Sequence, residues 1–114
     1  MKKFSCVLIG KYNLLSECGN ILLSKGHKIV AVICNDAEVE SWANNKKLLY
    51  GRDVSLIEEE VECDYLFSII NDSVLPKWLL ALPRYLAINY HDSLLPRYAG
   101  VHATSWAILN HEKR

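Results

Sequence analysis

The segment that decides the fold is a strand–helix–strand unit, and it reads YLFSIINDSVLPKWLLALPRYLAIN over residues 65–89. Its two apolar runs, Tyr65–Ile70 and Tyr85–Asn89, do not alternate with polar residues, which is typical of strands buried on both faces of a parallel sheet. Between them, Pro76 suits the first turn of a helix and Pro83 suits its end. The helix residues expected to face inward are Leu75, Trp78, Leu79 and Leu82.

The same pattern extends toward the amino terminus. Continuous apolar runs predict two further strands over Phe4–Gly10 and Ile29–Cys34. Apolar residues at three-and-four spacing predict a helix between these strands, and Gly26 stands where a helix C-terminus favours glycine. A weaker helical pattern follows the second of these strands and is expected to end at Gly51.

Two shorter elements complete the expected fold, an edge strand at Val54–Ile57 and a last helix over His102–Asn110. Strands that alternate with helices indicate an α/β protein with a Rossmann-like, mostly parallel sheet and helices on both faces. The 114 residues suffice for one domain or one lobe of a larger domain. Because the sequence stops where a further strand is expected, we predict that residues 1–114 lack the carboxyl-terminal part of a catalytic domain.

The composition excludes several classes of protein. Hydrophobic residues make up 51% of the chain, which is typical of a globular domain and not of a disordered one. The 13 basic and 13 acidic residues cancel, which disfavours nucleic acid as a partner of this part of the chain. No apolar run is long enough to span a membrane. The four cysteines lack the spacing of a zinc or redox site, so we expect no metal, reduced thiols and a cytoplasmic location.

The end of the predicted strand Tyr85–Asn89 and the residues after it contain candidate catalytic residues. No glycine-rich dinucleotide motif follows the first strand, so a nicotinamide or flavin cofactor is not expected. Asn89 and His91 are two residues apart, and in a strand such residues point to the same face while Tyr90 points to the other. An asparagine amide can stabilise a developing oxyanion, and a histidine can transfer protons. The alternative, that His91 only caps the end of a strand, stays open at this point.

The motif Asn89-x-His91-x-Ser93-Leu94-Leu95-Pro96-x-Tyr98-x-Gly100 resembles the signature of the formyltransferases that use 10-formyltetrahydrofolate. The family includes enzymes that act on glycinamide ribonucleotide, on methionyl-tRNA and on sugar nucleotides. The resemblance implies the family's amino-terminal, folate-binding lobe, with 10-formyltetrahydrofolate as formyl donor and no metal. It further implies that Asn89 holds the oxyanion and that His91 transfers protons. The folate-binding residues that it implies are Ile70, Asn71, Asp72, Val74, Ser93, Leu94, Leu95 and Pro96.

The same resemblance leaves some questions open. The family's catalytic aspartate lies further downstream than Arg114, and Asp92 does not match its position. The amine acceptor, whether tRNA, ribonucleotide, sugar nucleotide or carrier-bound amino acid, is not indicated. A fusion to, or association with, a further biosynthetic domain is one expectation. Two alternatives to formyl transfer are a formyltetrahydrofolate deformylase, which uses water as the acceptor, and a catalytically inactive lobe that binds folate or a partner.

Overall fold

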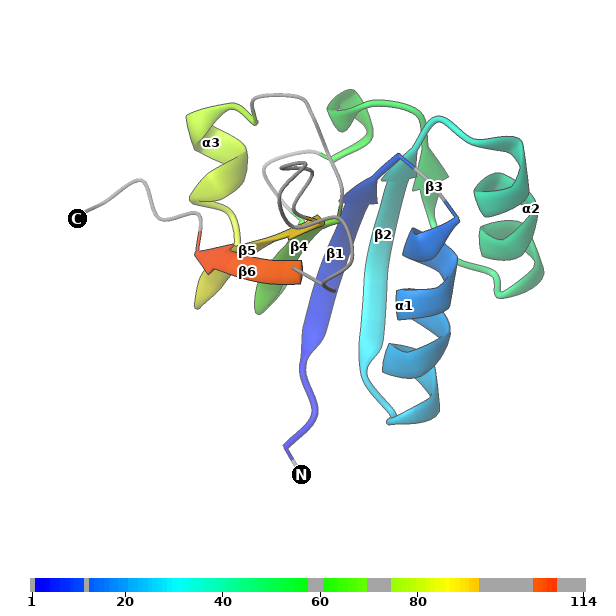
Figure 1. Ribbon diagram of the computed structural model, residues 1–114, viewed down its shortest axis with the longest axis horizontal. Helices are drawn as coiled ribbons and strands as arrows, with labels where there is room; N and C mark the ends of the chain where they lie inside the picture. Colours follow the sequence, from blue (N-terminus) through cyan, green and yellow to red (C-terminus); the bar gives the residue numbers. More distant parts are fainter. Residues whose placement is uncertain (1, 12, 58–60, 70–74, 93–103, 109–114) are drawn as a thin grey trace.

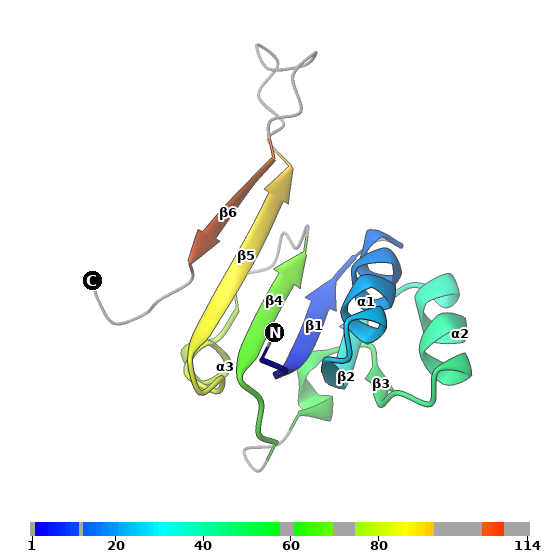
Figure 2. The same cartoon turned by 90° about the horizontal axis from the view of Figure 1, so that it is seen from below.

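The computed structural model describes residues 2–11, 13–57, 61–69, 75–92 and 104–108 (Figure 1). Its elements in chain order are β1 Ser5–Gly10, α1 Leu14–Ser24, β2 Lys28–Cys34, α2 Ala37–Asn45, β3 Tyr50–Gly51, the 3-10 helix η1 Val54–Leu56, β4 Tyr65–Ile69, α3 Lys77–Leu80, β5 Leu86–Asp92 and β6 Thr104–Ile108. They form one sheet in the order β3-β2-β1-β4-β5-β6. The first five strands in this order are parallel, and β6 pairs antiparallel with β5 (Figure 2). The predicted Rossmann-like α/β fold is confirmed.

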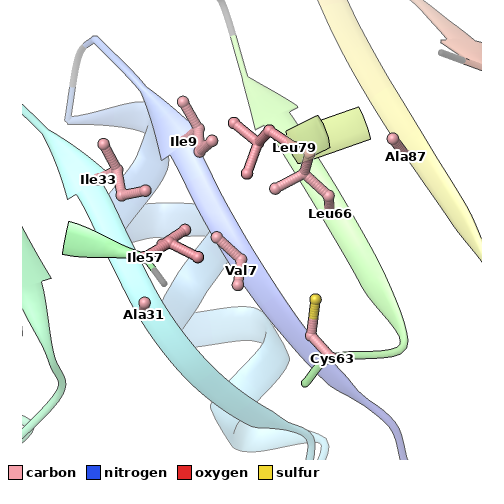
Figure 3. Close-up of a cluster of buried hydrophobic side chains, with 9 residues drawn as sticks. All are labelled: Val7, Ile9, Ala31, Ile33, Ile57, Cys63, Leu66, Leu79 and Ala87. Carbon is pink, nitrogen blue, oxygen red and sulfur yellow. The ribbon is translucent and has the colours of Figure 1, made fainter. Parts of the chain in front are cut away.

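The two faces of the sheet are buried by different elements. One face, here called the α1 face, packs Leu8, Val32 and Ile69 against residues of α1 and α2. The opposite face, called the α3 face, packs Val7 and Leu66 against side chains of η1 and α3. Figure 3 shows the α3-face cluster in front of the sheet with α1 behind it. Helices cover both faces, as the continuous apolar runs of the strands require.

The amino-terminal half follows the sequence closely. Gly26 has a φ of +88° and follows the end of α1, as predicted, because this left-handed conformation costs glycine little. The Asp36 side chain caps α2 by accepting hydrogen bonds from two backbone N–H groups. This helix ends at Asn45 rather than near Gly51, since Lys47 adopts a φ of 61° and turns the chain into β3.

Two predicted elements have a different conformation. The expected strand at Val54–Ile57 is instead η1, which Asp53 caps through the Ser55 N–H group. The expected helix over His102–Asn110 is contradicted by β6, whose residues pair with the edge of β5. Threonine, tryptophan and isoleucine in this segment favour a strand, and pairing satisfies the backbone groups of an otherwise open strand edge.

The crossover helix is shorter than expected. It covers Lys77–Leu80, with Pro76 at its N-cap position. Leu79 is completely buried in the α3-face cluster, whereas Trp78 is 42% exposed, so the prediction that Trp78 faces the core was wrong. Among the described residues, no helix is long and apolar enough to cross a membrane.

Candidate active site

The parallel strands all end at one edge of the sheet, where ligands of open α/β sheets bind. Strand β1 is the switch point, because β2 follows on one side of it and β4 on the other. A cleft of about 300 Å³ opens beside this point. Its apolar lining includes Ile9, Ile33 and Leu75, and its polar lining includes Asn35 and Arg52. The strand ends, η1 and the start of α3 thus form a mostly apolar cleft with a few polar groups, which is typical of small-molecule sites.

Gly10 brings the ends of β1 and β4 into close contact. A Cβ atom at this position would lie 2.4 Å from the backbone oxygen of Ile69. The contact is with backbone, so a side chain could not be accommodated by a rotamer change in a neighbour. The carboxyl end of β1 therefore favours glycine, immediately beside Ile69, the last residue of β4.

Asn89 is buried near the carboxyl end of β5, with 6% of its surface exposed. It lies on the α3 face, since Ala87 belongs to the α3-face cluster and strand side chains alternate. Tyr90 packs on the opposite, α1 face, as predicted. The extended backbone of β5 continues through His91 to Asp92, which is the condition for Asn89 and His91 to share a face.

Ser68 is a buried polar residue that the sequence analysis did not single out. It lies on β4 directly opposite Asn89 in the parallel register and is 2% exposed. Its other neighbour in the register is Ile9 on β1, whose own partner is Ile33 on β2. One row of side chains therefore crosses the α3 face from the cleft to Asn89. A serine between apolar residues in a predicted parallel strand was the signal available in the sequence.

The charged and titratable groups around the cleft include an ion pair, a carboxyl group and a thiol. Arg52 forms an exposed ion pair with Glu40, with 3.6 Å between nitrogen and oxygen. Hydrogen bonds from the side chain and backbone of Ser55 lower the pKa of the Asp53 carboxyl. Burial, reinforced by Asp36, raises the pKa of the Cys34 thiol to about 11, so this thiol is protonated at neutral pH and is not an activated nucleophile. Among the described residues, no cluster of histidine, cysteine and carboxylate side chains could hold a metal ion.

Several residues implied by the resemblance lie outside the described part of the chain. The backbone of His91 is described, but the position of its side chain is not. The residues predicted to bind folate all lie outside the described ranges, namely Ile70, Asn71, Asp72, Val74, Ser93, Leu94, Leu95 and Pro96. Ile69 and Leu75 are the described residues next to residues 70–74 in the sequence, and Gly10 and Leu75 line the cleft.

Comparison with known families identifies the chain's relatives. A family model described as "Formyl transferase" matches residues 22–114. The methionyl-tRNA formyltransferase of Alkaliphilus oremlandii is 27% identical over 127 aligned positions, which cover 95% of this chain and 41% of that protein. The corresponding enzyme of Caldanaerobacter subterraneus is 34% identical over 98 positions, covering 86% of this chain and 28% of that protein. The chain thus spans less than half the length of these relatives.

A solved structure shows the same fold. It is the crystal structure of glycinamide ribonucleotide transformylase 1 from Geobacillus kaustophilus, with a TM-score of 0.57 and 13% sequence identity. The match covers 100% of this chain and 86% of that chain. At this identity, the likeness supports the Rossmann-like arrangement of strands and helices.

Proposed function

Because the chain belongs to the formyl transferase family, we propose that its sheet edge serves the transfer of a formyl group from 10-formyltetrahydrofolate to an amine. The observation that carries this proposal is the placement of Asn89, a buried carboxamide at the carboxyl end of β5 with His91 two positions further along the same strand. A buried amide that can donate hydrogen bonds beside a proton-transferring group is the arrangement that acyl transfer requires.

Asn89 has the role of stabilising charge. As the amine attacks the formyl carbon, negative charge develops on the formyl oxygen, and the Nδ2–H group of Asn89 donates a hydrogen bond to it. Asn89 is only 6% exposed, so little water competes for this bond and the interaction is stronger than it would be in solution. The backbone of Asn89 is paired on both sides, with β4 and with β6, which fixes the point from which its side chain extends.

His91 has the role of moving protons. The attacking amine must lose a proton as its nitrogen forms the new bond to carbon, and the leaving nitrogen must gain one. An imidazole titrates near neutral pH and can carry out both transfers. His91 is the second-last residue of β5, near the carboxyl end of the strand. This position is compatible with access to a ligand beyond the strand ends.

The described residues fit a folate donor. A pterin ring is flat and has polar edges, and the cleft beside β1 combines an apolar lining from Ile9, Ile33 and Leu75 with the polar groups of Asn35 and Arg52. We propose that the donor is bound by residues 70–74 and 93–96, as the resemblance implies, with the cleft adjoining them. The donor supplies the formyl carbon, and no step needs a metal.

The proposal is tested with the full-length protein and four amine acceptors, namely initiator methionyl-tRNA, glycinamide ribonucleotide, an amino-sugar nucleotide and a carrier-bound amino acid. We expect one acceptor to be formylated. Asn89→Asp keeps the shape of the side chain but removes the donor, so kcat should fall about 10²- to 10³-fold. His91→Ala should reduce kcat by about 10²- to 10⁴-fold. The matched control is Asn44→Ala, which removes an exposed carboxamide on α2.

Three results would contradict the proposal. Unchanged formyl transfer by His91→Ala or Asn89→Asp would remove these residues from the chemistry. Release of formate from 10-formyltetrahydrofolate without any amine would instead support the deformylase alternative. Binding of the folate without turnover under all conditions would support a lobe that binds but does not catalyse.

A further inference from the structure

A second pocket lies at the end of the sheet where the parallel strands begin, opposite the proposed active site. Figure 1 shows this end of the sheet beside the amino terminus, at the start of β1. The pocket has a volume of about 530 Å³ and is lined by residues 2–4, 64–65 and 84–85. These three segments precede or begin β1, β4 and β5. The volume lies within the range of small-molecule sites.

Hydrogen bonds between the three segments hold the walls of the pocket. The backbone N–H of Tyr85 donates a 2.9 Å hydrogen bond to the backbone oxygen of Asp64. One carboxylate oxygen of Asp64 accepts a 3.0 Å hydrogen bond from the backbone N–H of Ser5. The other accepts a 2.9 Å hydrogen bond from the guanidinium of Arg84. The pocket is therefore formed by the fold itself and needs no rearrangement to admit a ligand.

Aromatic rings form one side of the pocket. The Phe4 ring stacks on buried His27, with 3.7 Å between the ring centroids, and meets the Tyr65 ring edge-on at 5.0 Å. Both Phe4 and Tyr65 pack against the core of the α1 face, which accounts for their presence. The Tyr85 ring lies 5.6 Å from that of Tyr65, but Tyr85 is 58% exposed. The core does not account for this ring, and its open surface is available to a ligand.

Positive charge exceeds negative charge around these rings. The lining carries three cations and one carboxylate, namely Lys2, Lys3, Arg84 and Asp64. Asp64 holds the Arg84 guanidinium in place through one of its five N–H donors, so others are available to a ligand. The contact of Arg84 with Glu62, at 3.8 Å, is an exposed ion pair and competes weakly. Lys3 packs against Gly26 at the end of α1, where a cation also stabilises the helix.

We propose that this pocket binds a nucleoside phosphate, with its base stacked on Tyr85 and its phosphate bound by Arg84 and Lys2. A base stacks on an aromatic side chain, and a guanidinium matches the geometry of phosphate oxygens. An apolar ligand would leave the cations unused, and inorganic phosphate would leave the rings unused. The same chemistry occurs in a free nucleotide and at the end of an RNA strand. The proposal does not depend on the reaction at the other end of the sheet.

Titration calorimetry of the full-length protein tests the proposal with adenosine monophosphate, adenosine and inorganic phosphate. We expect adenosine monophosphate to bind, and each of the two partial ligands to bind at least about 10-fold more weakly, because each lacks one of the two interactions. A short adenylate RNA is titrated in parallel. Tighter binding of the RNA would identify a strand end as the source of the ligand, and tighter binding of the monophosphate would identify a free nucleotide.

Substitutions locate the binding. Tyr85→Ala should weaken the binding of adenosine monophosphate about 10-fold, whereas Tyr85→Phe keeps the ring and should bind it as wild type does. Lys2→Gln should weaken binding about threefold and reduce its dependence on salt. The matched control is Trp78→Ala, which removes an exposed ring on α3 and should leave the affinity unchanged.

Three results would overturn the proposal. One is no binding of adenosine monophosphate at about 1 mM. Another is equal affinity of wild type and Tyr85→Ala, since the nucleotide then binds elsewhere. The third is a Tyr85→Phe protein that binds as weakly as Tyr85→Ala, since the ring then contributes nothing. A protein that fails to transfer formyl groups but binds the nucleotide as described would contradict the proposed function and support this pocket.

Discussion

Replacement of Gly10 by alanine tests how tightly the strand ends at the proposed site are packed. The new Cβ would lie 2.4 Å from the Ile69 backbone oxygen, and real Cβ contacts are essentially never shorter than 3.0 Å, so β1 and β4 must separate by about 0.6 Å. Overpacking of this kind costs about 1–3 kcal/mol. The loss of glycine's conformational freedom in the unfolded chain offsets about 0.5–1 kcal/mol. The net expected loss is at most about 2.5 kcal/mol, and about 1 kcal/mol at the middle of the two ranges, in the free energy of unfolding.

The same displacement should also weaken folate binding. Ile69 directly precedes Ile70, the first of the residues proposed to line the pterin pocket. A shift of several tenths of an ångström in this strand end moves the pocket relative to Asn89, and misplacement on this scale is expected to lower affinity about 10-fold. Urea denaturation measures the first effect. Titration calorimetry with 5-formyltetrahydrofolate, a stable analogue of the donor, measures the second.

The matched control is Gly19→Ala, which makes an equally close contact away from the sheet edge. Its Cβ would lie 2.2 Å from the ring of Trp42, whose indole nitrogen donates a 2.8 Å hydrogen bond to Asn20. This variant should lose stability through the contact between α1 and α2 and bind the folate analogue as wild type does. A Gly10→Ala protein with wild-type stability and wild-type affinity would refute the packing argument at the strand ends.

Further predictions concern the core and the titratable groups. Leu79→Ala should lower the free energy of unfolding by about 2–5 kcal/mol in urea denaturation, since the side chain is completely buried, whereas Trp78→Ala should cost much less. Burial raises the pKa of the Cys6 thiol to about 12 and the pKa values of the Cys34 and Cys63 thiols to about 11. At pH 8, these three thiols should therefore react with a disulfide reagent far more slowly in the folded protein than in the denatured protein. In an NMR titration, the pKa of the Asp53 carboxyl should lie below its usual value. It should return toward that value in Ser55→Ala, because the hydrogen bond from the serine side chain is the largest cause of the shift. Any stability that depends on this hydrogen bond is present above the unfolded-state pKa and is lost as the pH falls through the folded-state pKa.

The sequence predicted the parallel core well because continuous apolar runs have few alternative structures. The strands at Ser5–Gly10 and Lys28–Cys34 form close to the residues expected, and Gly26 ends the first helix as predicted. The predicted placement of Asn89 and Tyr90 on opposite faces of one strand is also confirmed. Alternation of side chains along a strand is a local rule, which makes it readable from sequence alone.

The errors occurred where tertiary context decides the structure. The segment Thr104–Ile108 follows a helix-compatible pattern, but pairing with the open edge of β5 makes it a strand. Val54–Leu56 forms a 3-10 helix because Asp53 caps it. Ser68 was missed because its significance comes from its neighbour across the sheet, 21 residues away in the chain, and registers between strands are not visible in one sequence. The roles of His91 and of the folate-binding residues stay predictions.

The most direct test of the account follows the formyl carbon itself. The full-length protein is given 10-formyltetrahydrofolate labelled with ¹³C in the formyl group, together with each amine acceptor, in a single turnover analysed by mass spectrometry. The account predicts that the label appears on the nitrogen of one acceptor and that His91→Ala leaves it on the folate. Label recovered as free formate in the absence of any amine, or transferred equally well by His91→Ala, would contradict the claim that this sheet edge performs formyl transfer.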